Sequence, residues 1–266
     1  MGIITISRGS YSRGLDIAQK LSKKLGYECI SREILLKASE DFNIPRVELV
    51  QAIENAPSVF DRLKHGKKKY VAFIREAFLD HIQNDNIVYH GYAGHYFTQG
   101  IPNILKVRII ANADYRIKVI MKRENVLKDQ ALKMLEQVDS ERRKWSMYLY
   151  GIDTNSPELY DIVLNVDCLK VDEAVDSLVT LANRPCFQTT QESLRKIKDM
   201  LSAARVHSAI MSNFPEAIVK CQNGVCIVSI ESALSAESMI SKKVKDLTKS
   251  IDGVKEVKTF IIPFET

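Results

Sequence analysis

The fold is decided by residues 2–14, which read GIITISRGSYSRG. Residues 2–7 contain a run of β-branched side chains, which predicts a strand buried in a parallel sheet. The turn formed by residues 8–14 is followed by apolar residues at helical spacing, which predict a helix. Gly9 and Gly14 have the G-x-x-x-x-G spacing of a phosphate-binding loop, where glycines let backbone N–H groups point at a phosphate beside the positive end of the next helix. The stretch therefore predicts a strand, an anion-binding loop and a helix in succession.

This loop departs from the Walker A sequence at two positions. Leu15 and Asp16 stand where that sequence has lysine and then serine or threonine, so the usual cation for the β- and γ-phosphates and the usual Mg²⁺ hydroxyl are absent from their places. Arg8 and Arg13 are the cations that can replace the lysine. Two glycines at this spacing also fit a plain strand-to-helix connection, so the spacing alone leaves both interpretations open.

Strand-like and helix-like segments alternate through the first two-thirds of the chain. Further strands are predicted at 27–30, 86–90, 105–111 and 160–166, and helices over much of 32–83 and at 114–123, 128–148 and 171–183. This alternation is typical of an α/β fold, a doubly wound parallel sheet with helices on both faces.

A different pattern begins at Arg184-Pro185. A helix at 192–203 precedes two strands, 217–222 and 225–230, which flank the hairpin signal Asn223-Gly224. A helix at 236–250, with Ser235 as its N-cap, and a strand at 254–263 complete a small αββαβ, α+β unit. We therefore expect two domains, residues 1–185 and residues 186–266.

Composition limits the classes of function. The 266 residues are 45% hydrophobic and 27% charged, which excludes wholesale disorder and collagen-like repeats. The formal charge of +5 suits phosphate-bearing small molecules and is too small to predict nucleic acid as a partner. No apolar run approaches the roughly 20 residues of a transmembrane segment. The five cysteines are predicted to be reduced thiols in the cytoplasm.

Residues 1–183 resemble the cytidylate kinase-like family of P-loop proteins. The likeness rests on the pattern ITISR at residues 4–8, the loop after it, KKLG at residues 23–26 and SREIL at residues 31–35, and it continues through the later strands and helices. The resemblance implies a doubly wound P-loop fold. It also implies phosphoryl transfer from ATP, with Mg²⁺, to a nucleoside monophosphate, CMP being the usual acceptor.

The resemblance also implies roles for single residues. Those of the nucleotide-phosphate loop are Arg8, Gly9, Ser10, Tyr11, Ser12, Arg13 and Gly14. Arg32 matches a basic residue near the acceptor. Arg123, Asp139, Arg142 and Arg143 resemble a mobile lid whose arginines reach over the transferred group. Such roles suit arginine, whose planar fork pairs with phosphate oxygens, although Arg142 and Arg143 also fit a solvated helix face.

The end of the third predicted strand holds further candidate residues. His90, Gly91 and Tyr92 lie where ligands bind in open α/β sheets, at the carboxyl ends of the strands. A phosphate or base contact by His90 or His95 competes with a purely structural role, and no cluster of cysteines or carboxylates completes a metal site there.

Three departures from the family pattern support a second hypothesis. Gly91-Tyr92 stands where related kinases have Gly-Arg, and Leu15 and Asp16 are also non-standard. The alternative to an enzyme is therefore a catalytically weak or inactive nucleotide-binding protein with a regulatory role.

Residues 187–266 resemble a BON domain. This likeness rests on the hairpin at residues 223–225, the amphipathic helix and the segment IDGVKEV at residues 251–257. It implies a regulatory module that senses a ligand or mediates assembly, for example into a homo-oligomer. Cys221 and Cys226 face each other if Asn223-Gly224 forms a two-residue turn. Their apolar neighbours favour two buried thiols over a disulfide.

Overall fold

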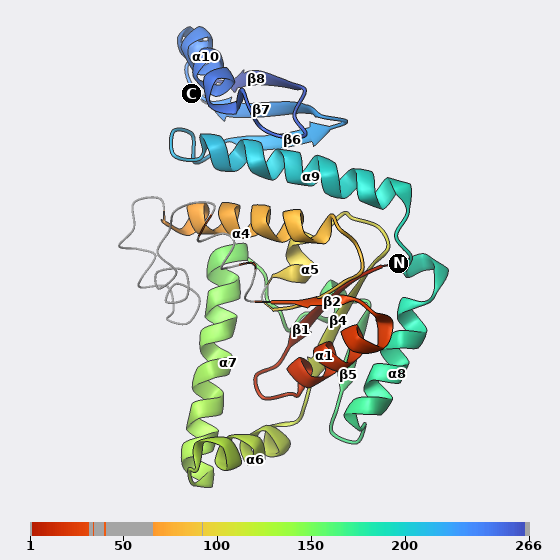
Figure 1. Ribbon diagram of the computed structural model, residues 1–266. Coiled ribbons are helices and arrows are strands. Elements are labelled where there is room, and N and C mark those ends of the chain that lie inside the picture. Colours follow the sequence, from red (N-terminus) through yellow and green to blue (C-terminus); the bar gives the residue numbers. More distant parts are fainter. Residues whose placement is uncertain (1, 32–33, 35–39, 41–65, 92, 264–266) are drawn as a thin grey trace. The chain divides into compact units, whose positions relative to one another are not determined.

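The structure is a computed structural model that describes residues 2–31, 34, 40, 66–91 and 93–263 (Figure 1). Its described residues fall into two compact units. The first comprises residues 2–31, 84–91 and 93–190, and the second comprises residues 34, 40, 66–83 and 191–263. Among the described helices, none has both the length and the apolar composition needed to cross a membrane.

The first unit is built on a five-stranded parallel sheet, as the alternation of segments predicts. Its strand order is β2(Glu28–Ile30), β3(Ile87–His90), β1(Ile3–Arg8), β4(Ile104–Ile110) and β5(Ile162–Asn165). Strand β1 is central, pairing in parallel with β3 through Ile3 and Ile87 and with β4 through Ile3 and Ile104. A strand in this position is covered on both faces, which explains the unbroken β-branched run at the start of the sequence.

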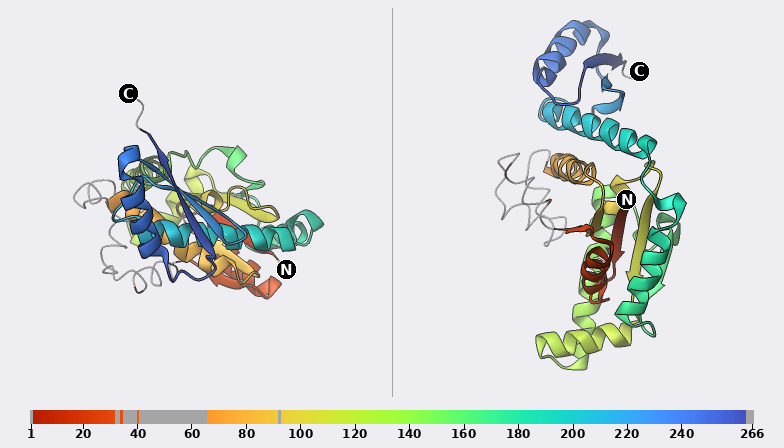
Figure 2. Two further views of the ribbon diagram at one scale, coloured as in Figure 1. Left: turned by 90° about the horizontal axis from the view of Figure 1, so that it is seen from above. Right: turned by 45° about the vertical axis from the view of Figure 1, so that its right-hand side comes forward.

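Helices cover both faces of this sheet. Ile4 and Ile6 of β1 pack in one core cluster with apolar residues of α1(Gly14–Leu25) and α8(Val171–Ala182). Thr5 points to the opposite face, where α5(Gly94–Phe97) contacts β1. The carboxyl end of α7(Lys128–Tyr150) packs on α5, since the Tyr150 ring lies 5.0 Å from that of Tyr96. Helices α7 and α8 accordingly lie on opposite sides of the strands (Figures 1 and 2).

Helices α6(Ala113–Glu124) and α7 form a pair that follows β4 in the chain. Asn112 begins α6, and its side chain accepts a hydrogen bond from the Tyr115 amide at 2.9 Å. The two helices share a small apolar cluster that includes Ile120 and Leu135. This packing fixes the polar face of α7 relative to the carboxyl end of β1.

The second unit has the predicted αββαβ order. Its elements are α9(Gln191–Ile210), β6(Ile218–Gln222), β7(Val225–Glu231), α10(Glu237–Thr248) and β8(Glu256–Ile262). Strand β7 pairs antiparallel with β6 and parallel with β8. The prediction of Ser235 as an N-cap is wrong, because a 3₁₀ turn over Leu234–Ala236 precedes α10.

Helix α4(Gly66–Ile82) belongs to the second unit. It packs against α9, and Asp80 forms a 2.8 Å ion pair with Arg205. The predicted domain boundary at residue 185 stays a prediction, while the structure groups α4, from the middle of the sequence, with the C-terminal elements.

The hairpin of the second unit contains a disulfide between Cys221 and Cys226. The two residues are directly opposite in the β6–β7 register, as the Asn223-Gly224 turn predicts. The expectation that they remain thiols is wrong, because the structure joins their sulfur atoms in a disulfide. The two-residue turn makes this possible by bringing their Cα atoms to 4.0 Å. Of the described cysteines, Cys168 and Cys186 are free thiols.

Candidate functional site

The loop between β1 and α1 has the conformation of an anion-binding nest. Tyr11 and Arg13 have left-handed backbones, both with φ of 57°, and the residues between and before them have negative φ. Such alternation turns successive backbone N–H groups toward one side. Arg13 occupies the N-cap of α1 and its side chain makes no capping hydrogen bond. The amides at the start of α1 are therefore not capped by that residue.

Ser12 ties this loop to the neighbouring strand. Its buried hydroxyl donates to the carbonyl of Gly9 at 2.8 Å and to that of Ile109 on β4 at 3.2 Å. The Gly9 amide donates to the same Ile109 carbonyl at 2.9 Å. The role of Ser12 is thus to fix the loop, which shapes the site without lining it.

Gly14 is required by close packing. A Cβ atom there would lie 2.6 Å from Cβ of Arg8, whereas a Cβ at Gly9 would meet nothing nearer than 3.7 Å. We expect Gly14→Ala to lower the free energy of unfolding by about 1–3 kcal/mol, as overpacking does, and Gly9→Ala to lower it by less. Urea unfolding of both variants measures the difference. Equal losses would show that the contact between Arg8 and Gly14 does not matter.

A cavity of about 220 Å³ lies beside this loop at the carboxyl ends of β1 and β4. Its wall contains the side chains of five arginines, contributed by the sheet and by α6 and α7: Arg8, Arg108, Arg116, Arg142 and Arg143. Asp139 supplies the one carboxylate among the described residues that line it. The excess of guanidinium groups makes the cavity suitable for an anion.

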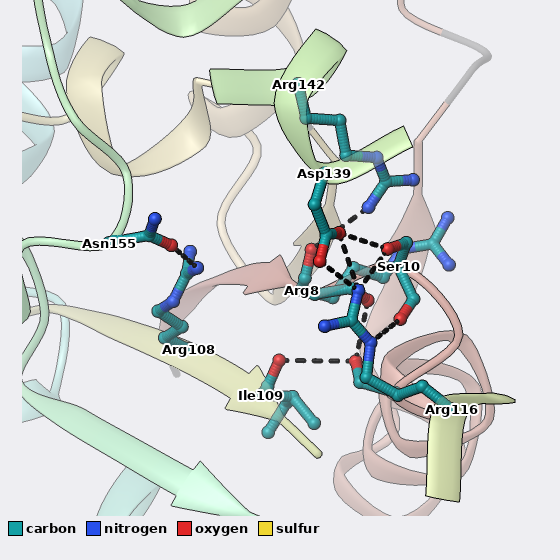
Figure 3. Close-up of polar contacts among 10 residues, drawn as sticks. Arg8, Ser10, Arg108, Ile109, Arg116, Asp139, Arg142 and Asn155 are labelled. Atoms are coloured by element: carbon teal, nitrogen blue, oxygen red, sulfur yellow. Dashed lines mark hydrogen bonds and ion pairs between the residues drawn. The ribbon is translucent and has the colours of Figure 1, made fainter. Parts of the chain in front are cut away.

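Arg116 and Asp139 lock the loop from the side of the helices (Figure 3). One terminal nitrogen of Arg116 lies 2.6 and 2.7 Å from the two carboxylate oxygens of Asp139. The Arg116 Nε donates to the Ser10 carbonyl at 2.7 Å, and the Ser10 hydroxyl bonds to both Arg116 and Asp139. Asp139 therefore neutralises the charge of Arg116.

Arg142 and Arg143 reach the same cavity from α7. Arg142 Nη1 donates to the carbonyl of Arg8 at 3.3 Å, next to the phosphate loop. Arg143 is more exposed and forms a 2.7 Å ion pair with Asp153. The structure thus places Arg8, Gly9, Ser10, Asp139, Arg142 and Arg143 around one cavity, and Gly91 lies in the same wall. Their roles stay predictions.

Other predicted residues lie elsewhere. Arg123 pairs with Glu124, and its guanidinium lies 6.0 Å from the Tyr11 ring centroid, outside the cavity wall. Arg13 stacks over the ring of Tyr115. His90 is buried at the end of β3. Arg32 and Tyr92 are outside the described residues. The predicted roles of these residues stay predictions.

Sequence reasoning missed Arg108, Arg116 and Asn155. Arg108 Nη2 donates to Asn155 Oδ1 at 2.6 Å, and both residues line the cavity. A usable signal was present, because a cation between the apolar residues Val107 and Ile109 of a buried strand needs a special environment. Arg116 carries no such signal, since arginine near the start of a helix is common on protein surfaces.

His95 is a buried neutral base in the cavity wall. It is 5% exposed, and its ring lies 5.0 Å from that of Tyr160. Burial lowers the pKa of His95 to about 4, and the nearby charges of Arg108 and Lys106 act in the same direction. At neutral pH its imidazole therefore carries no charge and adds nothing to the positive potential.

The family model described as the cytidylate kinase-like family matches residues 3–168. This chain belongs to the cytidylate kinase-like family. Two relatives named cytidylate kinase are each 28% identical to it. The one from Methanosarcina acetivorans aligns over 66% of this chain and 97% of its own, and the one from Sulfurisphaera tokodaii over 64% and 89%. A crystal structure of an uncharacterised protein from Eubacterium ventriosum has a similar fold, with a TM-score of 0.53 at 21% identity over 69% of this chain and all of that one.

In this member of the cytidylate kinase-like family, the residues of the cavity wall are suited to bind the phosphates of a nucleotide. They do not offer the ligands that Mg²⁺ needs from a protein. Loop amides and arginines are the groups that proteins use for phosphate. Mg²⁺ sites use one or two carboxylates besides phosphate oxygens, yet Asp139 is occupied by Arg116. No group of three or more His, Cys, Asp or Glu side chains suited to a metal is found in the part of the chain that the structure describes.

Proposed function

We propose that this protein transfers a phosphoryl group from ATP to a nucleoside monophosphate or a related small acceptor. The observation that carries the proposal is the set of five guanidinium groups beside the phosphate loop. Phosphoryl transfer needs little covalent help from the protein, but it needs cations around the charge that spreads over the transferred group. Family membership and the relatives named cytidylate kinase support the same reaction.

The side chains have different roles in this proposal. The loop from Gly9 to Gly14 holds phosphate of the donor. Arg142 reaches the loop from α7 and is placed to stabilise the charge of the transferred group. Arg116 is held by Asp139 and Ser10, so its proposed task is to fix the loop against the helices. A phosphate oxygen of a nucleoside monophosphate is already an anion and needs no base, which agrees with the pairing of Asp139. Mg²⁺ enters this proposal bound to the phosphates of ATP.

A second candidate function is nucleotide binding without turnover. It is favoured by Leu15 and Asp16, which replace the Walker lysine and hydroxyl. The BON-like module proposed for residues 186–266 would then sense a ligand or mediate assembly into a homo-oligomer. Sedimentation of the full chain with and without ATP tests the assembly, and one unchanged monomeric species under both conditions would contradict it.

ADP release separates the two candidate functions. The full chain is screened for binding by thermal shift with nucleoside mono-, di- and triphosphates. Ligands that bind are then tested in a coupled ADP-release assay with ATP and Mg²⁺. We expect one monophosphate to accelerate release above the rate with ATP alone. Nucleotide binding without acceptor-stimulated release would favour the regulatory function, and no binding of any nucleotide would contradict both.

A further inference from the structure

Arg108 is held in one orientation by uncharged neighbours. Its Nη1 donates to the Ser7 hydroxyl and the Tyr160 hydroxyl, both at 3.3 Å, and its Nη2 donates to Asn155 at 2.6 Å. The guanidinium also lies 5.5 Å from the Tyr160 ring centroid. Tyr160 is itself fixed, since its hydroxyl donates to the Thr154 carbonyl at 2.9 Å. These contacts preorganise the fork of Arg108 before any ligand binds.

No acid among the described residues matches the charge of Arg108. In the described ranges no carboxylate forms an ion pair with it, whereas Arg116 in the same wall is paired with Asp139. The adjacent His95 is buried and lines the cavity, and no hydrogen-bond partner for its Nδ1 is found among the described residues. A fixed cation beside buried aromatic rings, with neutral acceptors and no counter-ion among the described residues, favours an anion supplied by a ligand.

Arg108 is also separate from the cations of the phosphate loop. Figure 3 shows Arg108 and Asn155 on one side and the group of Arg116, Asp139 and Ser10 on the other. The cavity thus has two cationic ends. Phosphoryl transfer between two anionic substrates needs two groups of cations. One group holds the phosphates of the donor, and the other holds the acceptor.

We propose that Arg108, with Ser7 and Asn155 beside it, binds an oxyanion of the phosphoryl acceptor and selects acceptors that carry one. The inference rests on the proposed function and names the acceptor class, a small molecule with a phosphate or a carboxylate. The volume of about 220 Å³ agrees with a small anionic group, since pockets for drug-sized ligands hold about 300–1,000 Å³.

Calorimetric titration of the full chain tests this subsite. The probes are CMP and glycerate, each titrated into protein saturated with ADP, and ADP alone for the phosphate loop. We expect Arg108→Gln to lower the affinity for the acceptor probe about 10- to 100-fold. This is the usual range for the loss of a hydrogen bond to a charged group. ADP affinity should stay within about twofold, because the two ends share no partner. Arg108→Lys should recover part of the loss, since it keeps the charge and loses the fork.

The control is Arg184→Gln, which removes an exposed arginine of the same unit outside the cavity and should change neither affinity. A selective loss of CMP identifies phosphate as the group that binds Arg108, and a selective loss of glycerate identifies carboxylate. Three results would overturn the subsite. In Arg108→Gln, the affinities for ADP and for the acceptor probe could fall equally, or neither affinity could change. The unmodified protein could also bind neither acceptor probe.

The same variants keep the two proposals distinguishable. CMP binding through Arg108 without ADP release would refute the proposed function and retain the subsite. Acceptor-dependent ADP release with an unchanged acceptor KM in Arg108→Gln would refute the subsite and retain the function.

Discussion

Replacing Arg142 with glutamine should lower kcat for acceptor-dependent ADP release by about 100- to 1,000-fold, the range found when one preorganised donor to a transition-state charge is removed. Arg142 lies on α7 and its guanidinium reaches the carbonyl of Arg8, beside the phosphate loop. Glutamine keeps a hydrogen-bond donor on a shorter side chain and removes the charge. The main loss should therefore appear in kcat, because the charge on the transferred group is greatest in the transition state.

The folded state should tolerate this change. Arg142 is one of five arginines in the cavity wall, so its removal relieves repulsion between like charges. We expect the melting temperature to change little, while Arg142→Lys retains an intermediate rate because it keeps the charge without the fork. Arg184→Gln serves as the control and should keep the normal kcat. A normal kcat in Arg142→Gln, or an equal loss in Arg184→Gln, would remove Arg142 from the catalytic group.

Much of the first unit follows from local sequence. The β-branched run at residues 3–8 is a central strand, and the glycines at 9 and 14 bound a loop whose second glycine is needed for contact with Arg8. These features depend on neighbours within a few residues, and local patterns report them well. The lid residues predicted on α7 rest on family resemblance, because a charged helix face alone does not reveal which cavity it meets.

The residues that were missed depend on long-range pairing. Arg108 enters the cavity because β4 lies directly beside β1, and Arg116 because α6 packs against α7. No local pattern encodes the order of strands in a sheet. The disulfide is a different case, because the turn correctly predicts the register of Cys221 and Cys226 but register does not determine whether two thiols are oxidised.

Acidification should destabilise the first unit through His95. In the unfolded chain this imidazole titrates near 6.5, and in the folded protein burial, with Arg108 and Lys106 nearby, lowers its pKa to about 4. Above pH 6.5 His95 is neutral in both the folded and the unfolded state, so its ionisation does not change the free energy of unfolding there. Between these two values the unfolded state binds a proton that the folded state does not. The free energy of unfolding should therefore fall by about 1.4 kcal/mol per pH unit, or about 3 kcal/mol in all.

The difference between the unmodified protein and His95→Gln isolates this effect, because glutamine does not titrate and all carboxylates are common to both. Burial also lowers the pKa of His207 in the second unit, so both proteins should carry His207→Gln. The single tryptophan, Trp145 of α7, belongs to the first unit, and its fluorescence can follow urea unfolding between pH 7.5 and 4.5. At pH 4.5 the two stability curves should have converged by about 2.5 kcal/mol relative to their separation at neutral pH. Parallel curves would show that His95 titrates alike in both states, and His95→Asn repeats the comparison if the glutamine variant does not fold.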